Sequence, residues 1–189
     1  MLTVKRFLAV MLAVSAVFWA ASAYSEIVRD AELGKPYRFK GNAKVTLTDF
    51  SFVTKIAADE GDGISCARDE EIALLKADIT NLRKESFNFG DVISVNVIYY
   101  DDGDYLSYRG AAGQYSFNNP EKISMYLCDY NPWIGGFIYR TSFYPIGARY
   151  TRSFAFYCAL PKAVVHDEAS PLQMIIKIGD DELVYNIRK

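Results

Sequence analysis

The chain has 189 residues, of which 51% are hydrophobic and 23% charged, and its formal net charge is −2. This length is typical of a single domain, and the composition is that of a globular protein. The near balance of charge, without any run of Lys or Arg, argues against nucleic-acid binding, which depends on many contacts between basic side chains and phosphates. Tyr and Phe occur 14 and 12 times, and such rings favour β-strands.

The first 23 residues have the pattern of a cleavable signal peptide. Lys5 and Arg6 form a short positive segment, residues 7–20 are almost entirely apolar, and residues 21–23 (Ala-Ser-Ala) suit a cleavage site. The apolar run of about 14 residues is shorter than the roughly 20 that a membrane-spanning helix needs. We therefore predict an exported protein, periplasmic or secreted, whose mature part (residues 24–189) is one domain with no membrane span.

Three cysteines, Cys66, Cys128 and Cys158, follow the leader. Disulfides form in exported proteins, and three cysteines allow one bridge with three possible pairings. The sequence does not select a pairing, although a bridge from Cys66 to either of the others would tether a loop rich in Gly and Asp. The remaining thiol is expected to be buried and inert; an intermolecular bridge is the alternative.

The mature chain begins with an extended lead-in over residues 24–43, in which Pro36 suits an edge or the start of a strand. Residues 44–53 alternate between two faces and predict a strand, and residues 57–70 predict an acidic loop. Residues 71–81 have good helix propensity, but their apolar residues recur at every second position. We therefore predict a strand there as well.

The second half of the chain continues as short strands separated by turn residues. Residues 91–100 carry β-branched side chains at period two, and a turn with Gly103 follows. Further strands are predicted as one or two within 105–117, then 123–130, 137–143, 150–160, 172–178 and 182–187. The last two are expected to form a hairpin through a tight turn at Gly179-Asp180.

This pattern predicts an all-β fold, an antiparallel β-sandwich of about eight or nine strands. Strands that alternate with helices are the sign of a parallel α/β fold, and no such alternation is seen. No repeat, low-complexity stretch or linker divides residues 24–189, so one domain is expected.

Four segments, in chain order, resemble the secreted immunoglobulin-like domains grouped with the mycobacterial immunoprotective extracellular protein. They are Leu33-Gly34-Lys35-Pro36 with residues 44–48 (KVTLT), residues 75–81 (LKADITN), Phe154-Ala155-Phe156 with Pro161, and residues 172–187. The long aromatic region at residues 104–143 and the cysteines depart from this pattern. The resemblance implies an immunoglobulin-like sandwich and export, and it supplies no catalytic residue.

The residues give little support to catalysis or to a cofactor. The single histidine, His166, lies in a polar segment after a predicted strand, where we expect an exposed loop residue rather than a general base. Cys66, Cys128, Cys158 and His166 lack the close spacing of zinc ligands. No phosphate-binding loop or dinucleotide fingerprint is present. We expect no metal and no cofactor.

Acidic residues cluster in four predicted turns, at residues 59–62, 101–104, 167–168 and 180–181. Turn chemistry and solubility explain each cluster. Asp101, Asp102 and Asp104 carry the hard oxygens that calcium prefers, but not the spacing of an EF-hand. A two-carboxylate hydrolase would need two of these groups in one cleft and is the least favoured function.

The aromatic residues are the strongest anomaly, because 17 of the 28 lie between Tyr99 and Tyr157. Loop aromatics on a rigid scaffold form contact surfaces with large area and little loss of side-chain entropy. The alternative is that the long connections fold over the sandwich and bury their own rings. The candidate binding residues are Tyr105, Tyr108, Tyr130, Trp133, Tyr139 and Tyr144.

The sequence thus predicts an exported, non-catalytic binding or envelope-associated protein that contacts a protein partner through aromatic loops. A carbohydrate-binding module is the alternative, since sugars stack on exposed rings. A row of exposed, coplanar rings would favour the second function.

Overall fold

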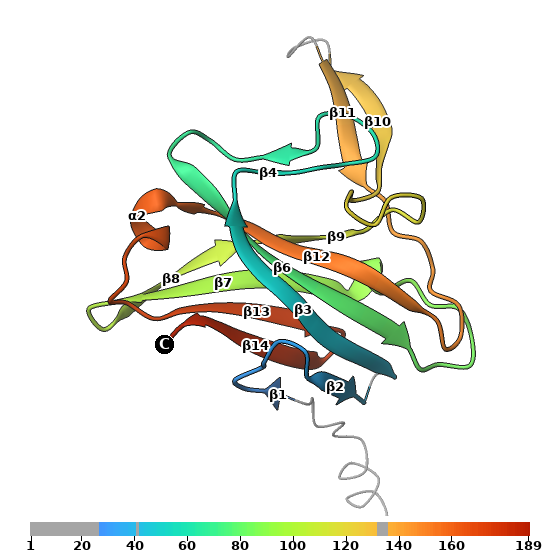
Figure 1. The fold of residues 1–189 in the computed structure, drawn as a ribbon, viewed down its shortest axis with the longest axis horizontal. Helices are drawn as coiled ribbons and strands as arrows, with labels where there is room; N and C mark the ends of the chain where they lie inside the picture. Colours follow the sequence, from blue (N-terminus) through green and yellow to red (C-terminus); the bar gives the residue numbers. More distant parts are fainter. Residues whose placement is uncertain (1–26, 41, 132–135) are drawn as a thin grey trace, which may run out of the picture.

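The computed structural model describes residues 27–40, 42–131 and 136–189, with the backbone alone at 129–131 and 136–138. Two five-stranded sheets pack face to face (Figure 1). In spatial order, the first sheet consists of β2 (Pro36–Phe39), β3 (Ala43–Val53), β6 (Glu70–Asn81), β12 (Thr151–Pro161) and β9 (Ala111–Gln114). The second consists of β1 (Ile27–Val28), β14 (Asp181–Arg188), β13 (Leu172–Ile178), β7 (Ile93–Asp101) and β8 (Asp104–Arg109).

Smaller elements connect and cover these sheets. Two strand pairs stand apart from them, β4 (Lys55–Ile56) with β5 (Ile64–Ser65), and β10 (Met125–Asn131) with β11 (Gly136–Thr141). A 3₁₀ helix, η1 (Phe89–Val92), precedes β7, and a short helix, α2 (Lys162–Val165), follows β12. The sequence pattern did not indicate α2.

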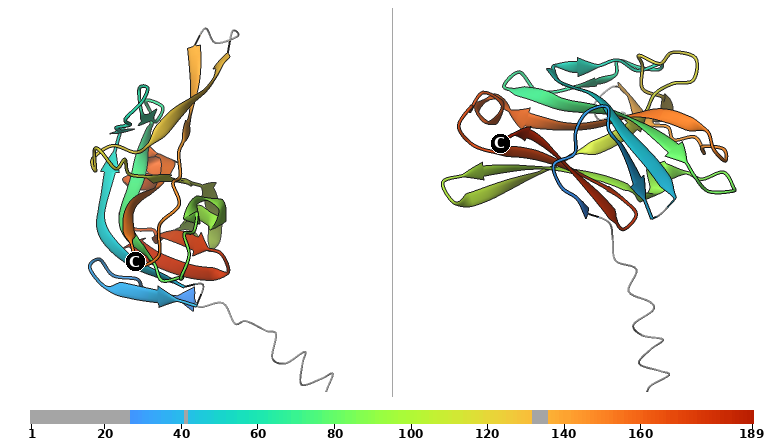
Figure 2. Two further views of the ribbon diagram at one scale, coloured as in Figure 1. Left: turned by 90° about the vertical axis from the view of Figure 1, so that its right-hand side faces the viewer. Right: turned by 60° about the horizontal axis from the view of Figure 1, so that its bottom comes forward.

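The strand order is that of an immunoglobulin-like sandwich. The run β3-β6-β12-β9 corresponds to strands A-B-E-D, and β14-β13-β7-β8 corresponds to G-F-C-C′. The predicted all-β, immunoglobulin-like sandwich is therefore confirmed. All pairs are antiparallel except β1 with β14. The β10–β11 hairpin is an insertion between strands D and E, and Figure 2 shows it standing away from the two sheets.

The core follows from the period-two pattern of the strands. Val45, Leu47 and Leu75 from the first sheet face Val97 and Met174 from the second, and each is fully buried. The segment predicted as a strand despite its helix propensity is β6, the central strand of its sheet. Because β6 is covered on both faces near its start, the run 72–75 is buried without interruption.

Several local predictions are also confirmed. Pro36 begins β2, an edge strand, where its missing amide donor costs no ladder bond. The segment 105–117 holds two strands, β8 and β9. The turn between β7 and β8 places Asp102 and Gly103 at φ +43° and +93°, as a primed hairpin turn requires.

No helix in the described ranges is long and apolar enough to cross a membrane. The predicted signal peptide, residues 1–23, lies outside the described residues.

Candidate functional site

The aromatic residues predicted to form one surface do not all lie together, because those that the structure describes belong to two separate parts of the molecule. Tyr105 and Tyr108 belong to β8, at the edge of the second sheet, whereas Tyr139 belongs to β11 and Tyr144 follows it (Figure 1). The backbone of Tyr130 lies in β10. Its side chain, and Trp133 as a whole, lie outside the described residues.

The base of the β10–β11 hairpin is held by Asp59, from the loop after β4. Asp59 accepts hydrogen bonds from the Met125 amide at 2.8 Å and the Ser124 hydroxyl at 3.1 Å. Burial raises the pKa of this carboxyl, but the hydrogen bonds from Met125, Ser116 and Ser124 outweigh it and hold the pKa below its usual value. The acidic loop therefore serves as an anchor for the hairpin.

Gly61, in the same loop, makes room for the ring of Tyr139. A Cβ at Gly61 would lie 2.9 Å from Cδ2 of Tyr139, and the residue has φ +72°. Any other residue would therefore strain the loop and displace the ring. Tyr139 is half-buried, so its role is at least partly structural.

Other rings of the long connection are also turned inward. Tyr115 is buried in a second cluster that covers the outer face of β6 and β12, and burial raises its pKa to about 12. Tyr108 and Phe143 pack against the main core. The idea that the connection buries its own rings thus holds for these residues.

A second group of side chains near the hairpin remains exposed. Tyr126 and Leu127 of β10 are 45% and 49% exposed, Tyr144 is 57% exposed, and Phe117 is 76% exposed. Phe117 comes from the connection 115–124, which lies at the base of the hairpin in Figure 1. These four residues are called the hairpin surface below. Sequence reasoning included only Tyr144 among them.

The strands of the hairpin pair with each other, and in the described part of the chain they join neither large sheet. A register shift between Leu127 and Asp129 marks a bulge at Cys128, which bends a strand locally. Beyond the bulge, the backbone of β11 continues without a register shift. In the described part of the chain, the hairpin thus offers exposed apolar side chains and outer strand edges that pair with neither large sheet.

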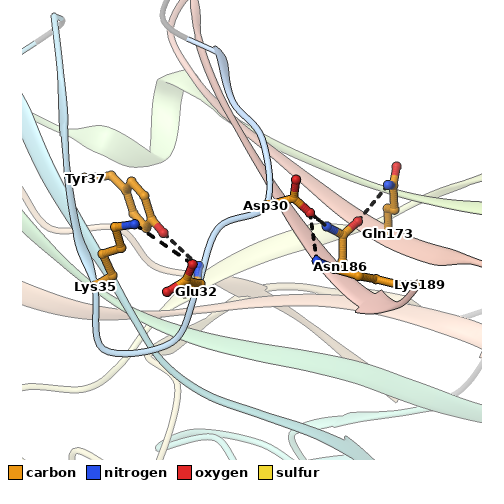
Figure 3. Close-up of polar contacts among 7 residues, drawn as sticks. All are labelled: Asp30, Glu32, Lys35, Tyr37, Gln173, Asn186 and Lys189. Atoms are coloured by element: carbon orange, nitrogen blue, oxygen red, sulfur yellow. Dashed lines mark hydrogen bonds and ion pairs between the residues drawn. The ribbon is translucent and has the colours of Figure 1, made fainter.

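A different feature occupies the outer face of the second sheet. A chain of side-chain contacts runs across it: the Tyr100 hydroxyl donates to Gln173 Oε1 at 3.3 Å, and Gln173 Nε2 donates to Asn186 Oδ1 at 2.7 Å. Asn186 then donates to Asp30, which also pairs with Lys189 at 3.2 Å (Figure 3). The contacts link residues from β7, β13 and β14 with the segment after β1.

These residues line an open groove of about 570 Å³. Arg29, Glu182 and Arg188 add charges to its wall. At its border, Tyr100 and Tyr105 are directly opposite each other on β7 and β8, and are 40% and 67% exposed. The sequence carried a partial signal for this face, because polar and apolar residues share its alternating positions, such as Gln173 with Ile175 and Asn186 with Val184. The sequence did not show which strands would be neighbours.

The expected disulfide is not present, since Cys66, Cys128 and Cys158 are all free cysteines. They belong to three different environments. The Cys66 thiol donates to the carbonyls of Thr54 and Glu70, Cys128 is exposed on the hairpin, and Cys158 is buried in the core. Burial raises the pKa of Cys158 to about 11, so this thiol is inert at neutral pH, as expected for one of the three.

The described residues do not form a recognisable catalytic arrangement. His166 caps the C-terminus of α2 with its side chain 65% exposed, and its Nε2 lies 3.3 Å from Glu71 Oε1 rather than from a Ser or Cys side chain. Within the described ranges, no group of three or more His, Cys, Asp or Glu side chains could hold a metal ion.

No family model matches the chain, and no curated protein matches it. The chain is similar in structure to an uncharacterised β-sandwich protein from Clostridium difficile 630, with a TM-score of 0.59 and 15% identity, over 88% of this chain and 100% of that one. A conserved hypothetical protein from Bacillus anthracis (TM-score 0.43, 8% identity, 79% and 96% covered) and the YjhA protein from Bacillus subtilis (TM-score 0.38, 14% identity, 76% and 80% covered) are more distant. The first similarity supports the β-sandwich fold.

Proposed function

We propose that this protein is an exported, non-catalytic binding protein that contacts a protein partner through its β10–β11 hairpin. The observation that carries the proposal is the hairpin surface: four large apolar side chains, 45% to 76% exposed, at a projecting insertion in the fold. Large apolar side chains left exposed on a projecting element are candidates for an interaction site. Tyr126 and Leu127, as successive residues of β10, present such side chains on both faces of the hairpin.

The hairpin also suits one mode of recognition, the addition of an extended segment from the partner. A two-stranded hairpin alone is marginally stable in water, so a third strand would stabilise it. Only Asp129 and Arg140 carry charge in the sequences of β10 and β11, so charge does little to keep another strand away. The partner is therefore expected to be a protein that presents an extended, largely apolar segment.

Export is proposed on the leader sequence, with its basic start, apolar run and Ala-Ser-Ala ending. A partner would then be sought in the periplasm or outside the cell. A non-catalytic role is proposed because the His166 side chain is 65% exposed, with an acidic partner and no nucleophile beside it among the described residues, and the acidic loop at Asp59 anchors the hairpin.

A pull-down with the mature domain, residues 24–189, from envelope and culture-supernatant extracts tests this function. One bait carries Tyr126→Ser, Leu127→Ser and Tyr144→Ser, and a matched control carries Tyr150→Ser, which alters a ring that is 71% exposed away from the hairpin. A partner retained by the native and control baits and lost with the triple variant is expected. Retention by all three baits would rule out the hairpin surface.

A saccharide-binding function is the second candidate, and a separate observation favours it. Tyr100 and Tyr105 are opposed, exposed rings beside a groove lined with amides and charges. Rings of this kind present flat apolar faces, and the neighbouring polar groups could bond to hydroxyls.

A polysaccharide-binding screen with the Tyr100→Ser, Tyr105→Ser double variant separates the two functions. Binding lost in this variant and kept in the hairpin variant would place a sugar site on the groove. Binding unaffected by the double variant would exclude the groove.

A further inference from the structure

Three loops meet at one end of the sandwich, where β6 ends and β3 and β12 begin (Figure 1). They are the segment that starts at Asn42 and the segments 82–88 and 145–150. Backbone hydrogen bonds join them: Leu82 donates to Asn42 at 2.8 Å, Arg149 donates to Asn81 at 2.9 Å, and Phe87 donates to Ile146 at 3.0 Å. This end is therefore built as a connected unit.

Asn81 organises these loops from the inside. Its side chain is fully buried, and its Nδ2 donates to the carbonyls of Glu85 at 2.8 Å and Ile146 at 2.7 Å. Its Oδ1 accepts from the Arg83 amide at 2.9 Å. A buried amide whose bonds are made in this way holds the loops in one arrangement.

The loops enclose an open depression of about 540 Å³. Three cations line it, Arg83, Lys84 and Arg149, with one carboxylate, Glu85, beside them. Three positive charges against one negative charge leave the rim at +2, although the whole chain carries −2. The depression is therefore a positive site on an acidic protein.

The cations are not neutralised within the described part of the chain. No carboxylate there lies within 4.0 Å of Arg83, Lys84 or Arg149. Arg83 stacks on the ring of Phe87, with Cζ 3.7 Å from the centroid, and its buried Nε makes no hydrogen bond in the described residues. The ring fixes the guanidinium without satisfying its donors.

Two features of the backbone also characterise the depression. The amides of residues 84–86 donate no hydrogen bond to described parts of the chain, so they are available to an acceptor from outside. Arg149 has φ +68°, a conformation that favours Gly, Asn or Asp over arginine. The loop thus holds an arginine at a position whose backbone conformation favours other residues.

We infer that this depression binds a phosphate group. Guanidinium groups match phosphate with paired N–H···O bonds, and loop amides commonly complete such sites. The ligand is thus a phosphorylated molecule or the phosphate headgroup of a lipid. This inference is independent of the hairpin and of its protein partner.

The first experiment is a ¹H–¹⁵N NMR titration of the mature domain with inorganic phosphate, compared with sodium chloride at equal ionic strength. Phosphate is expected to shift the amides of residues 82–86 and 149–150 at concentrations where chloride does not. Equal shifts with both salts, or shifts spread over the whole domain, would overturn the inference, because general screening acts on all exposed charges.

Variants make the test specific. Arg149→Asn with Lys84→Gln removes two cations, avoids Arg83, which packs on Phe87, and places Asn where φ is positive. Its phosphate affinity is expected to fall by about tenfold or more, since each lost bond involves a charged group. Arg149→Lys keeps the charge but loses the paired donors of the guanidinium, so its affinity is expected to lie between those of the native protein and the double variant. Lys55→Gln, at an exposed cation outside the depression, should leave it unchanged; an equal loss there would contradict a defined site.

A final comparison distinguishes the two sources of phosphate. Vesicles of phosphatidylcholine, with and without phosphatidic acid, are sedimented with the native domain and with the double variant. Binding that needs phosphatidic acid and is lost in the variant identifies a lipid headgroup. Free phosphate bound in solution without vesicle binding identifies a soluble phosphorylated ligand.

Discussion

The two ends of the sandwich differ in whether their charged side chains have partners within the protein. At the end near α2, Asp167 accepts hydrogen bonds from the Tyr99 hydroxyl at 2.6 Å and the Ala169 amide at 3.0 Å. Arg188 donates to the carbonyls of Ser170, Val165 and Val164. The charged groups of this corner are engaged by the protein itself.

At the opposite end, called the open end below, the side chain that anchors the loops is a neutral amide, and the charged side chains have no carboxylate partner in the part of the chain that the structure describes. Asn81 makes the internal bonds, while Arg83, Lys84 and Arg149 line a depression without a carboxylate partner in the described residues. A charge whose hydrogen bonds are made within the protein stabilises the fold, whereas charges that are held in place without a partner are available to a ligand.

The largest effect is expected from Asn81→Ala, which removes the anchor of the open end. The two carbonyls and the Arg83 amide would lose their buried partner, at a cost of about 3 kcal/mol or more in the free energy of unfolding. For a domain of this size, Tm should fall by about 10 °C. Chemical denaturation checks the value, with Asn186→Ala, on the exposed groove, as a control that should cost well under half as much.

Arg188→Met tests the end of the sandwich near α2, called the closed corner below, where Asp167 and Arg188 are hydrogen-bonded within the protein. The substitution keeps much of the apolar stem but leaves three carbonyls without their donor, so we expect a loss of about 2 kcal/mol. The same denaturation assay measures it. Lys189→Met is the neighbouring control, because its contact with Asp30 is exposed on both sides and such pairs contribute little. Equal effects would contradict the assignment of a structural role to Arg188.

The closed corner should also make stability depend on pH. Hydrogen bonds from Ser170, Tyr99 and Ala169 hold the pKa of Asp167 well below its usual range. A carboxyl whose pKa is lower in the folded state stabilises the fold above its unfolded pKa, about 4, and loses this contribution as pH falls. We expect the native Tm to decrease below about pH 4, and the decrease to be smaller in Asp167→Asn. An unchanged acid profile in that variant would show that another group, such as Asp59, dominates.

Much of the fold was accessible from the sequence because strand periodicity reports directly on burial. Val95, Val97 and Tyr99 alternate with exposed or half-exposed residues, and the strand containing them was predicted. The hairpins at Gly103 and Gly179 follow from local turn residues. Such features depend on neighbours in the chain.

The candidate sites were less accessible because they depend on contacts between distant segments. The Asn81 loops join positions near 42, 82 and 149, and no spacing in the sequence indicates that they meet. Tyr139 looked like a free contact residue, but Gly61, far earlier in the chain, accommodates its ring. The disulfide expectation was wrong for a related reason, since the number of cysteines does not show that their elements lie apart.

The smallest expected change in the free energy of unfolding is an increase, whereas the other variants decrease it. Arg149→Asn should stabilise the protein by about 1 kcal/mol, because Asn adopts positive φ more readily than Arg, and φ at this position is +68°. The open end would then become more stable while its affinity for phosphate decreases. Paired measurements of Tm and of phosphate binding check both parts. Arg149→Lys is the control that should leave Tm unchanged and weaken phosphate binding less than Arg149→Asn does. If Arg149→Asn instead lowered Tm, Arg149 would stabilise the fold. It would then resemble the charged residues near α2 rather than a charge that is available to a ligand.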